Sequence, residues 1–333
     1  MRLGLEVPAV SSSSEEQADW LELNAITASR QSSSYHDLVR ALQRSGTADA
    51  TCESVRDEEG YISSVADDAF AELDDRVHAC GGQRGTYPFS LSEQIIELRC
   101  APEESVYVFL LLLSAFGKDV GPQGLHGERV FEDICSQAAA SYFGAPDPHV
   151  GATVFGFPRR VLPANFPEAV EELCKRIGEG GGNKSQPRSK DQKDAKLDVV
   201  IWRNFPDGRR AKLIGFGQCA TGVYWSNKCS ELQPGDWCSY WMMDAPLVTP
   251  MKFFFVPHRI DQARWDHTGT FGGIVFDRCR IALHSAQLDA KLNKRCTQWS
   301  RHVIKDKLLG GASSRPATRT KQSAKRTKSS SRK

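Results

Sequence analysis

Two short apolar segments joined by a strong turn signal limit the possible folds more than any other part of the chain. Residues 197–202 and 212–218 are rich in β-branched and aromatic side chains, which is typical of β-strands. Between them, Pro206, Asp207 and Gly208 form a turn signal. We therefore predict a hairpin that carries Asp198 near the start of its first strand and Gln218 at the end of its second.

The segments around this hairpin alternate between helical and extended patterns. Apolar residues at helical spacing predict helices that end at Gly144 and at Gly178, one running from about Tyr224 to Leu232, and a final one containing Trp299. Residues 152–157, 251–256 and 273–276 have strand-like composition. We therefore expect an α/β fold over residues 121–305, with a mixed sheet flanked by helices.

The first third of the chain has a helical pattern instead. Residues 65–77 have apolar side chains at helical spacing, as do Ile95, Ile96 and Leu98. The apolar run at residues 106–116 is about half of what crosses a bilayer, which takes roughly 20 residues, and we interpret it as a buried helix of a soluble protein. We expect a disordered segment at 1–15, order from near Trp20, and a helical module at 16–120.

Charge and cysteine content restrict the possible partners and compartment. The net charge is +2, but residues 313–333 hold eight of the 43 basic residues and no acidic one, so the rest has 35 against 41 acidic residues. Overall basicity therefore does not argue for nucleic-acid binding. Such binding would need a local basic patch on the folded part, or the basic tail at 306–333. Ten cysteines without a CxxC pair favour reduced thiols in the cytoplasm.

Residues 178–196 contain clusters of amino acids that break regular secondary structure, which predicts a mobile loop.

The hairpin carries groups suited to phosphodiester cleavage. That reaction needs hard divalent cations that activate water and neutralise phosphoryl charge. A carboxylate such as Asp198 on one strand, an acceptor such as Gln218 on the next, and a nearby lysine make up such a site. Alternatively, Asp198 caps a loop or forms an ion pair, and Gln218 bonds to backbone groups.

The residues of this hairpin resemble the signature of the PD-(D/E)XK nuclease superfamily, which includes restriction enzymes and bacterial phage-defence effectors. The matching segments are LDVVIW at 197–202 and GFGQCATG at 215–222. The predicted order helix, strand, strand, strand, helix, strand over residues 129–256 is similar to the family core. The helix at 166–177 would be an insertion.

The resemblance implies a ligand set for Mg²⁺ or Mn²⁺. By position, Asp198 would be the central metal ligand, and Gln218 would stand where the family usually has Glu. The backbone carbonyl of Cys219 would complete the first shell, and Glu132 would be a direct or water-mediated ligand. A carboxylate in the first turn of a helix, such as Glu132, is also favoured by the helix dipole alone.

One position departs from the family pattern. Ala220 stands where the catalytic lysine is expected. Lys228, on the segment that follows, is the candidate replacement, and Lys212 is the alternative. Lys228 is also explained as an ordinary solvated charge.

The sequence thus leaves three hypotheses. The first is a metal-dependent nuclease that cuts DNA in restriction or phage defence, with a homodimer or a defence-system protein as a possible partner. The second is a catalytically inactive nuclease-fold protein that binds DNA or acts as a scaffold. The third is an interaction protein stabilised by zinc, whose candidate ligands would be Cys219, Cys229, Cys238, Cys279 and His258.

Overall fold

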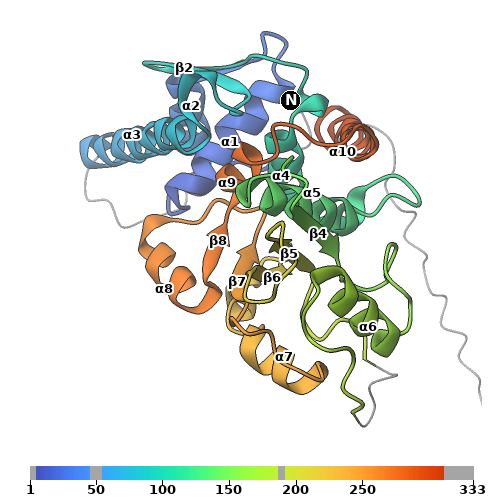
Figure 1. Ribbon diagram of the computed structural model, residues 1–333. Coiled ribbons are helices and arrows are strands. Elements are labelled where there is room, and N and C mark those ends of the chain that lie inside the picture. The colour runs from blue at the N-terminus through green and yellow to red at the C-terminus, as the bar shows by residue number, and fades with distance from the viewer. Residues whose placement is uncertain (1–4, 46–54, 187–191, 311–333) are drawn as a thin grey trace, which may run out of the picture.

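A five-stranded mixed sheet forms the centre of the second half of the chain. The computed structural model describes residues 5–45, 55–186 and 192–310. Strands β4, β5 and β6 are antiparallel neighbours, and β6, β7 and β8 are parallel neighbours. The prediction of a mixed α/β fold is confirmed at this level (Figure 1). The strands are β4 (Val150–Val154), β5 (Val199–Arg203), β6 (Leu213–Cys219), β7 (Met251–Phe255) and β8 (Ile274–Phe276).

The predicted hairpin is present as β5 and β6. Val199 pairs with Gly217 and Arg203 pairs with Leu213. Both faces of β5 are covered, because Val199 and Ile201 belong to one buried cluster whereas Val200 and Trp202 belong to another. Burial on both faces explains why β5 is a nearly continuous apolar run.

Different helices cover the two faces of the sheet. Helix α5 (Gly127–Tyr142) packs on β4 and β5 and shares a buried cluster with Val199 and Ile201. Helices α6 (Phe166–Ile177) and α7 (Pro234–Trp241) contribute Leu173 and Trp237 to the cluster on the opposite face. In Figure 1, α6 and α7 lie at the end of the molecule opposite the helices of the first third, α1 (Ser14–Thr27), α2 (Tyr35–Ser45) and α3 (Val55–Ala79).

The predicted helix from Tyr224 to Leu232 is wrong. That stretch holds only a short 3-10 helix, η5 (Trp225–Lys228), and the α-helix α7 follows it. Pro234 is in the first turn of α7, where the missing N–H of proline costs nothing. The apolar spacing of Trp237, Cys238 and Trp241, which are buried, then directs this helix toward the sheet.

The first third combines helices with a small antiparallel sheet. Its helices are α1 (Ser14–Thr27), α2 (Tyr35–Ser45) and α3 (Val55–Ala79), and its strands are β1 (Ser32–Ser34), β2 (Phe89–Ser92) and β3 (Ile95–Leu98). The helical interpretation of Ile95, Ile96 and Leu98 is wrong, because they lie in β3. Ile95 is exposed while Ile96 and Leu98 are buried, which is the two-residue period of a strand. Helix α1 begins six residues before Trp20, with Ser13 as its cap.

The predicted boundary near residue 120 does not separate two cores. Helix α4 (Val106–Phe116) is buried, as expected, and packs against α9 (Arg278–Leu283) and α10 (Ala290–Val303). One buried cluster runs from Ala18 in α1 to Leu308 near the end of the described chain. The remaining helical elements are α8 (Gln262–Gly272), the 3-10 helices Gly82–Arg84, Pro102–Glu104 and Lys118–Val120, and the π-helix Ile304–Leu309. None of the described helices has the length and apolar character needed to span a membrane.

A buried ionic network ties the first helix to the second half of the chain. Arg76 of α3 and Arg278 of α9 both bond to Asp19 of α1, at 2.7 and 2.5 Å. Arg76 also lies 3.0 Å from the buried carboxylate of Glu22. Because an unpaired buried charge is costly, each of these groups holds its partners in place.

The loop at 178–196 is anchored at its start. Glu179 is buried, and its carboxylate accepts hydrogen bonds from the backbone N–H groups of Ala211 (2.9 Å) and Leu247 (3.0 Å). Residues 187–191 of this loop, and residues 311–333 of the basic tail, lie outside the described residues.

Candidate functional site

Asp198 is fixed at the point where β4, β5 and β6 come together. Its backbone N–H donates to the Gly217 carbonyl (2.9 Å), and its own carbonyl accepts from the N–H groups of Phe155 (2.7 Å) and Gly156 (3.1 Å). Its side-chain Oδ2 accepts from the Cys219 N–H (2.8 Å). The side chain therefore takes the place of a backbone acceptor at the end of β6, which orients the carboxylate.

Glu132 of α5 brings a second carboxylate to the same place. A Cβ atom added to Gly156 would lie 3.3 Å from Asp198 Oδ1 and 3.3 Å from Glu132 Oε2. The two oxygens are therefore no more than twice that distance apart. Because Gly156 has no side chain, both carboxylates can pack against its backbone.

The pair has an excess of negative charge. Burial, and then the charge of Asp198, raise the pKa of Glu132 to about 8. Burial also raises the pKa of Asp198 to about 7, against the hydrogen bond from the Cys219 N–H and the charges of Lys228 and Lys196. The Arg160 Nη2 lies 3.9 Å from Glu132 but bonds more closely to Asp133, at 2.7 Å. A cation between the carboxylates would offset the free-energy cost of ionising two neighbouring buried carboxyl groups.

Gln218 is buried, and its amide is held on one side only. Its Nε2 donates to Glu231 Oε2 (2.9 Å), whereas its Oε1 is buried without a hydrogen-bond partner among the described residues. Successive side chains of a strand point to opposite faces of the sheet, so Gln218 and Cys219 of β6 do so too. Cys219 packs against the buried cluster that contains α5. The structure therefore brings Glu132 and Asp198 together, and it bonds Gln218 to a different carboxylate.

The peptide of Cys219 offers a further oxygen. In a β-strand the N–H and C=O of one residue point to the same side. Since the Cys219 N–H is bonded to Asp198, its carbonyl also lies on the Asp198 side of β6. This is the carbonyl that the resemblance assigned to the first shell.

The lysine candidates differ in position. Lys212 immediately precedes β6, at the end of the strand away from Asp198. Its Nζ donates to Asn204 Oδ1 (2.8 Å), so it is no substitute for a catalytic lysine. Lys228 is exposed on η5, and its charge acts on Asp198. Ala220, at the position where the resemblance expects a lysine, is fully buried in the core.

Two residues near the site were missed by sequence reasoning. Glu231 accepts from both Gln218 and Lys196, the latter at 3.0 Å. Both Lys196 and Glu231 lie on segments without regular periodicity, so only their closeness in sequence to Asp198 and Lys228 could have drawn attention to them.

The zinc site that sequence reasoning considered has no counterpart in the described part of the chain. No group of three or more His, Cys, Asp or Glu residues there is placed to hold a metal ion. Cys238, Cys229 and Cys279 belong to three separate buried clusters. A cation at the candidate site would therefore have two carboxylates, with other oxygens completing its shell, a low carboxylate count that Mg²⁺ accepts.

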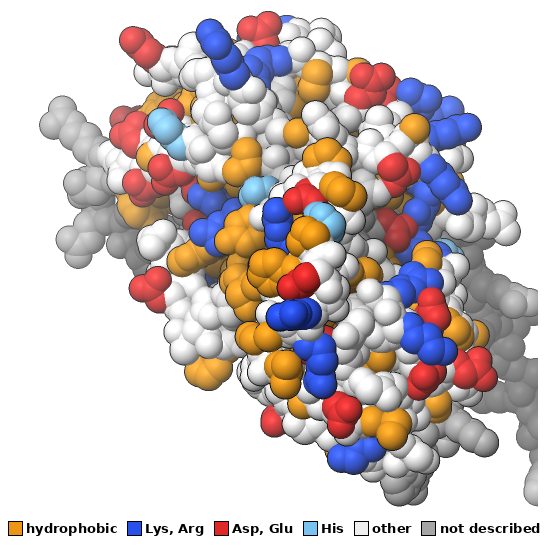
Figure 2. Space-filling view, viewed as in Figure 1, with side chains coloured by type: hydrophobic (Ala, Val, Ile, Leu, Met, Phe, Trp, Pro, Cys, Tyr) orange, Lys and Arg blue, Asp and Glu red, His pale blue; other side chains and the backbone are white. Residues whose placement is uncertain are grey.

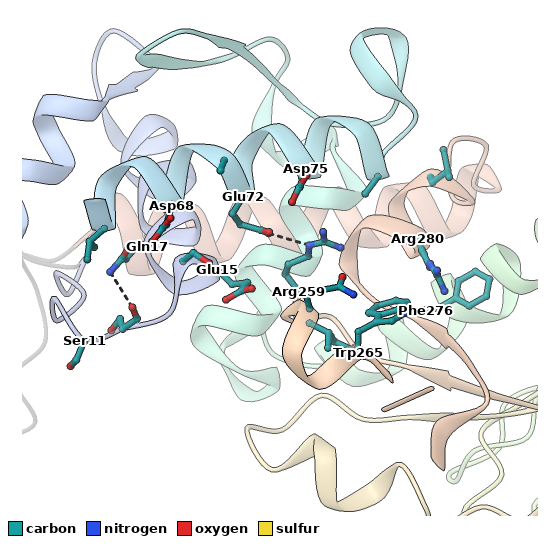
Figure 3. Close-up of a pocket in the computed structure, with 18 of the residues that line it drawn as sticks. Ser11, Glu15, Gln17, Asp68, Glu72, Asp75, Arg259, Trp265, Phe276 and Arg280 are labelled. Carbon is teal, nitrogen blue, oxygen red and sulfur yellow. Dashed lines mark hydrogen bonds and ion pairs between the residues drawn. The ribbon is translucent and has the colours of Figure 1, made fainter. Parts of the chain in front are cut away.

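A cavity of about 1030 Å³ opens away from this site, between α3 and residues 259–284. Figure 3 shows Arg259 reaching across it to Glu72, with Trp265 and Arg280 on the opposite wall. Glu132 and Asp198 do not line it. On the face seen in Figure 2, Lys and Arg side chains are interspersed with Asp and Glu, so that face has no continuous basic surface.

Comparison of the chain with protein-family models, with curated proteins and with solved structures gave no significant match.

Proposed function

We propose that the protein is a divalent-metal-dependent nuclease, with DNA as its substrate. The observation that carries the proposal is the Glu132–Asp198 carboxylate pair, whose pKa values are raised to about 8 and about 7 and which lies against the backbone of Gly156. Perturbed carboxylates of this kind cluster at functional sites.

The residues present fit one hard cation. Glu132, Asp198 and the carbonyl of Cys219 would hold Mg²⁺ or Mn²⁺, with water in the remaining positions. When bound, the ion would activate a water molecule and neutralise charge on the phosphoryl oxygens. The protein's own part is to orient Asp198 through the Cys219 N–H and to hold Glu132 against it from α5. Lys228 and Lys196 supply positive charge on the Asp198 side.

The order of elements supports the same proposal. The structure has α5, β4, β5, β6, α7 and β7 in the order on which the resemblance to PD-(D/E)XK nucleases rests, with α6 inserted after β4. That resemblance places the activity in restriction or phage defence.

The proposal is tested with purified full-length protein, supercoiled plasmid and single-stranded DNA, each with Mg²⁺, Mn²⁺ or EDTA. We expect metal-dependent cleavage by the wild type, loss of cleavage in Asp198→Asn, and wild-type cleavage in Asp207→Asn, a matched change in the exposed turn between β5 and β6. Equal cleavage by the wild type and Asp198→Asn would remove Asp198 from the mechanism.

A second candidate is a nuclease-fold protein that binds DNA without cutting it. Buried Ala220 in the lysine position, and Gln218 bonded to Glu231, favour it. This candidate predicts that DNA is retained in a gel-shift assay and stays intact with either metal.

A further inference from the structure

Glu231 joins two side chains beside the candidate site. Its Oε2 accepts from Gln218 Nε2 (2.9 Å) and from Lys196 Nζ (3.0 Å). Gln218 is buried and rigidly placed on β6, so it fixes the position of the Glu231 carboxylate. Glu231 in turn fixes the ammonium of Lys196, although the Lys196 side chain is 57% exposed.

The backbone at Lys196 is held in an unusual conformation. Ala195 and Lys196 have φ values of 55° and 70°, in the left-handed region that residues other than glycine rarely adopt. Asp194 stabilises this bend, because its Oδ1 accepts from the Lys196 N–H (3.0 Å) and its carbonyl accepts from the Leu197 N–H (3.2 Å). An ordinary surface ion pair does not require a strained backbone, and such strain is concentrated at functional sites.

The bend places a positive charge close to Asp198. Lys196 precedes Asp198 by two residues, and its ammonium acts on the Asp198 carboxylate, as does that of Lys228. The two lysines differ in how they are held, because no ion pair within the described chain holds the Lys228 Nζ.

We propose that Lys196 provides the positive charge that the buried Ala220 cannot provide, and that Glu231 is the positioning residue that holds it there. This inference rests on the proposed nuclease function. In hydrolysis, the oxygen of water forms a bond to phosphorus and the water gives up one proton, while the bond to the leaving ester oxygen breaks and leaves its electron pair on that oxygen. The leaving oxygen takes up one proton, which balances the proton that the water loses. Negative charge grows on the phosphoryl oxygens meanwhile, and a fixed ammonium stabilises it.

The same arrangement explains why position 218 holds an amide. A carboxylate there would face Glu231 Oε2 at the 2.9 Å now spanned by a hydrogen bond, with like charges in contact. Gln218 donates instead, so Glu231 remains free to bind Lys196 with its negative charge.

The test compares Lys196→Met with Lys228→Met and with Lys193→Met, a nearby exposed control. We expect Lys196→Met to slow DNA cleavage about 100-fold and to bind Mn²⁺ about threefold more tightly in calorimetry, since a nearby positive charge is removed. Cleavage by Lys193→Met should stay at the wild-type rate, and Lys228→Met should lose much less activity than Lys196→Met. A purely structural ion pair would not weaken cleavage while strengthening metal binding.

An exchanged pair separates the two roles further. The variant Lys196→Glu/Glu231→Lys keeps an ion pair, so its thermal stability should match that of the wild type, but its cleavage should remain low because the charge has moved. Full recovery of cleavage in this variant, or wild-type cleavage in Lys196→Met, would overturn the inference. If the wild type itself neither binds Mn²⁺ nor cuts DNA, the proposed function fails instead.

Discussion

Replacing Gly156 by alanine tests the carboxylate pair without removing either carboxylate. The added methyl carbon would lie 3.3 Å from Asp198 Oδ1 and from two atoms of the Glu132 carboxylate. The backbone of Gly156 is outside the left-handed region, so alanine adds no backbone strain there. The perturbation is therefore confined to the space between the two carboxylates.

The size of the effect follows from these distances. Optimal contacts of a methyl carbon are about 3.5–4.0 Å, so the carboxylates must move by a few tenths of an ångström. Oxygens that share one Mg²⁺ must each approach to about 2.0–2.1 Å, which the methyl group opposes. We expect Mn²⁺ affinity to fall at least tenfold, or about 1.4 kcal/mol. The free energy of unfolding in EDTA should fall by about 1–2 kcal/mol.

Calorimetric titration with Mn²⁺, urea unfolding in EDTA and plasmid cleavage measure these three quantities. Gly222→Ala is the matched control, since a Cβ there meets no atom within 4 Å and lies shortly after β6. A folded Gly156→Ala protein with unchanged Mn²⁺ affinity and cleavage would show that no cation binds between Glu132 and Asp198.

Three other changes test the electrostatics. Because the pKa of Asp198 is raised to about 7, its ionised form destabilises the metal-free protein. Asp198→Asn should therefore have a free energy of unfolding about 1–2 kcal/mol higher than the wild type at pH 8. Urea unfolding near pH 4 should show no such advantage. Burial lowers the pKa of His258 to about 4, so protonation of this side chain destabilises the fold as the pH falls from 6.5 to 4. The loss of stability over this pH range should be smaller in His258→Asn than in the wild type, by at most about 3 kcal/mol. Arg76→Met removes the shortest ion pair of the buried Glu22 carboxylate, leaving it only Arg278 at 3.7 Å, and should cost about 3–5 kcal/mol. Arg209→Met, at a side chain that is 86% exposed, should change stability by less than about 0.5 kcal/mol.

The hairpin and several helices were predictable because local chemistry and tertiary packing agree there. The Pro206–Gly208 turn and the apolar runs on each side specify β5 and β6 without knowledge of the rest of the chain. The segment Ile95–Leu98 shows the opposite case. Three apolar residues in four positions fit a helix or a strand equally well, and only pairing with β2 and β1 decides between them.

The candidate site was predictable only in part for a similar reason. Asp198 and Glu132 are brought together by the packing of α5 on the sheet, which the order of elements indicated. The role of Lys196 depends on positive φ angles at two residues other than glycine, and amino-acid preferences do not signal such a conformation. The bond between Gln218 and Glu231 depends on where η5 ends, and that end was predicted wrongly.

The ionic network between α1 and α9 has a consequence for biosynthesis. Asp19 and Arg278, one of its two arginine partners, are separated by 259 positions, so the carboxylate leaves the ribosome long before that guanidinium. Contacts so distant along the chain slow folding. The nascent N-terminal helices therefore remain incompletely packed until Arg278 has been made, and during that interval their apolar surfaces are open to aggregation and to chaperones.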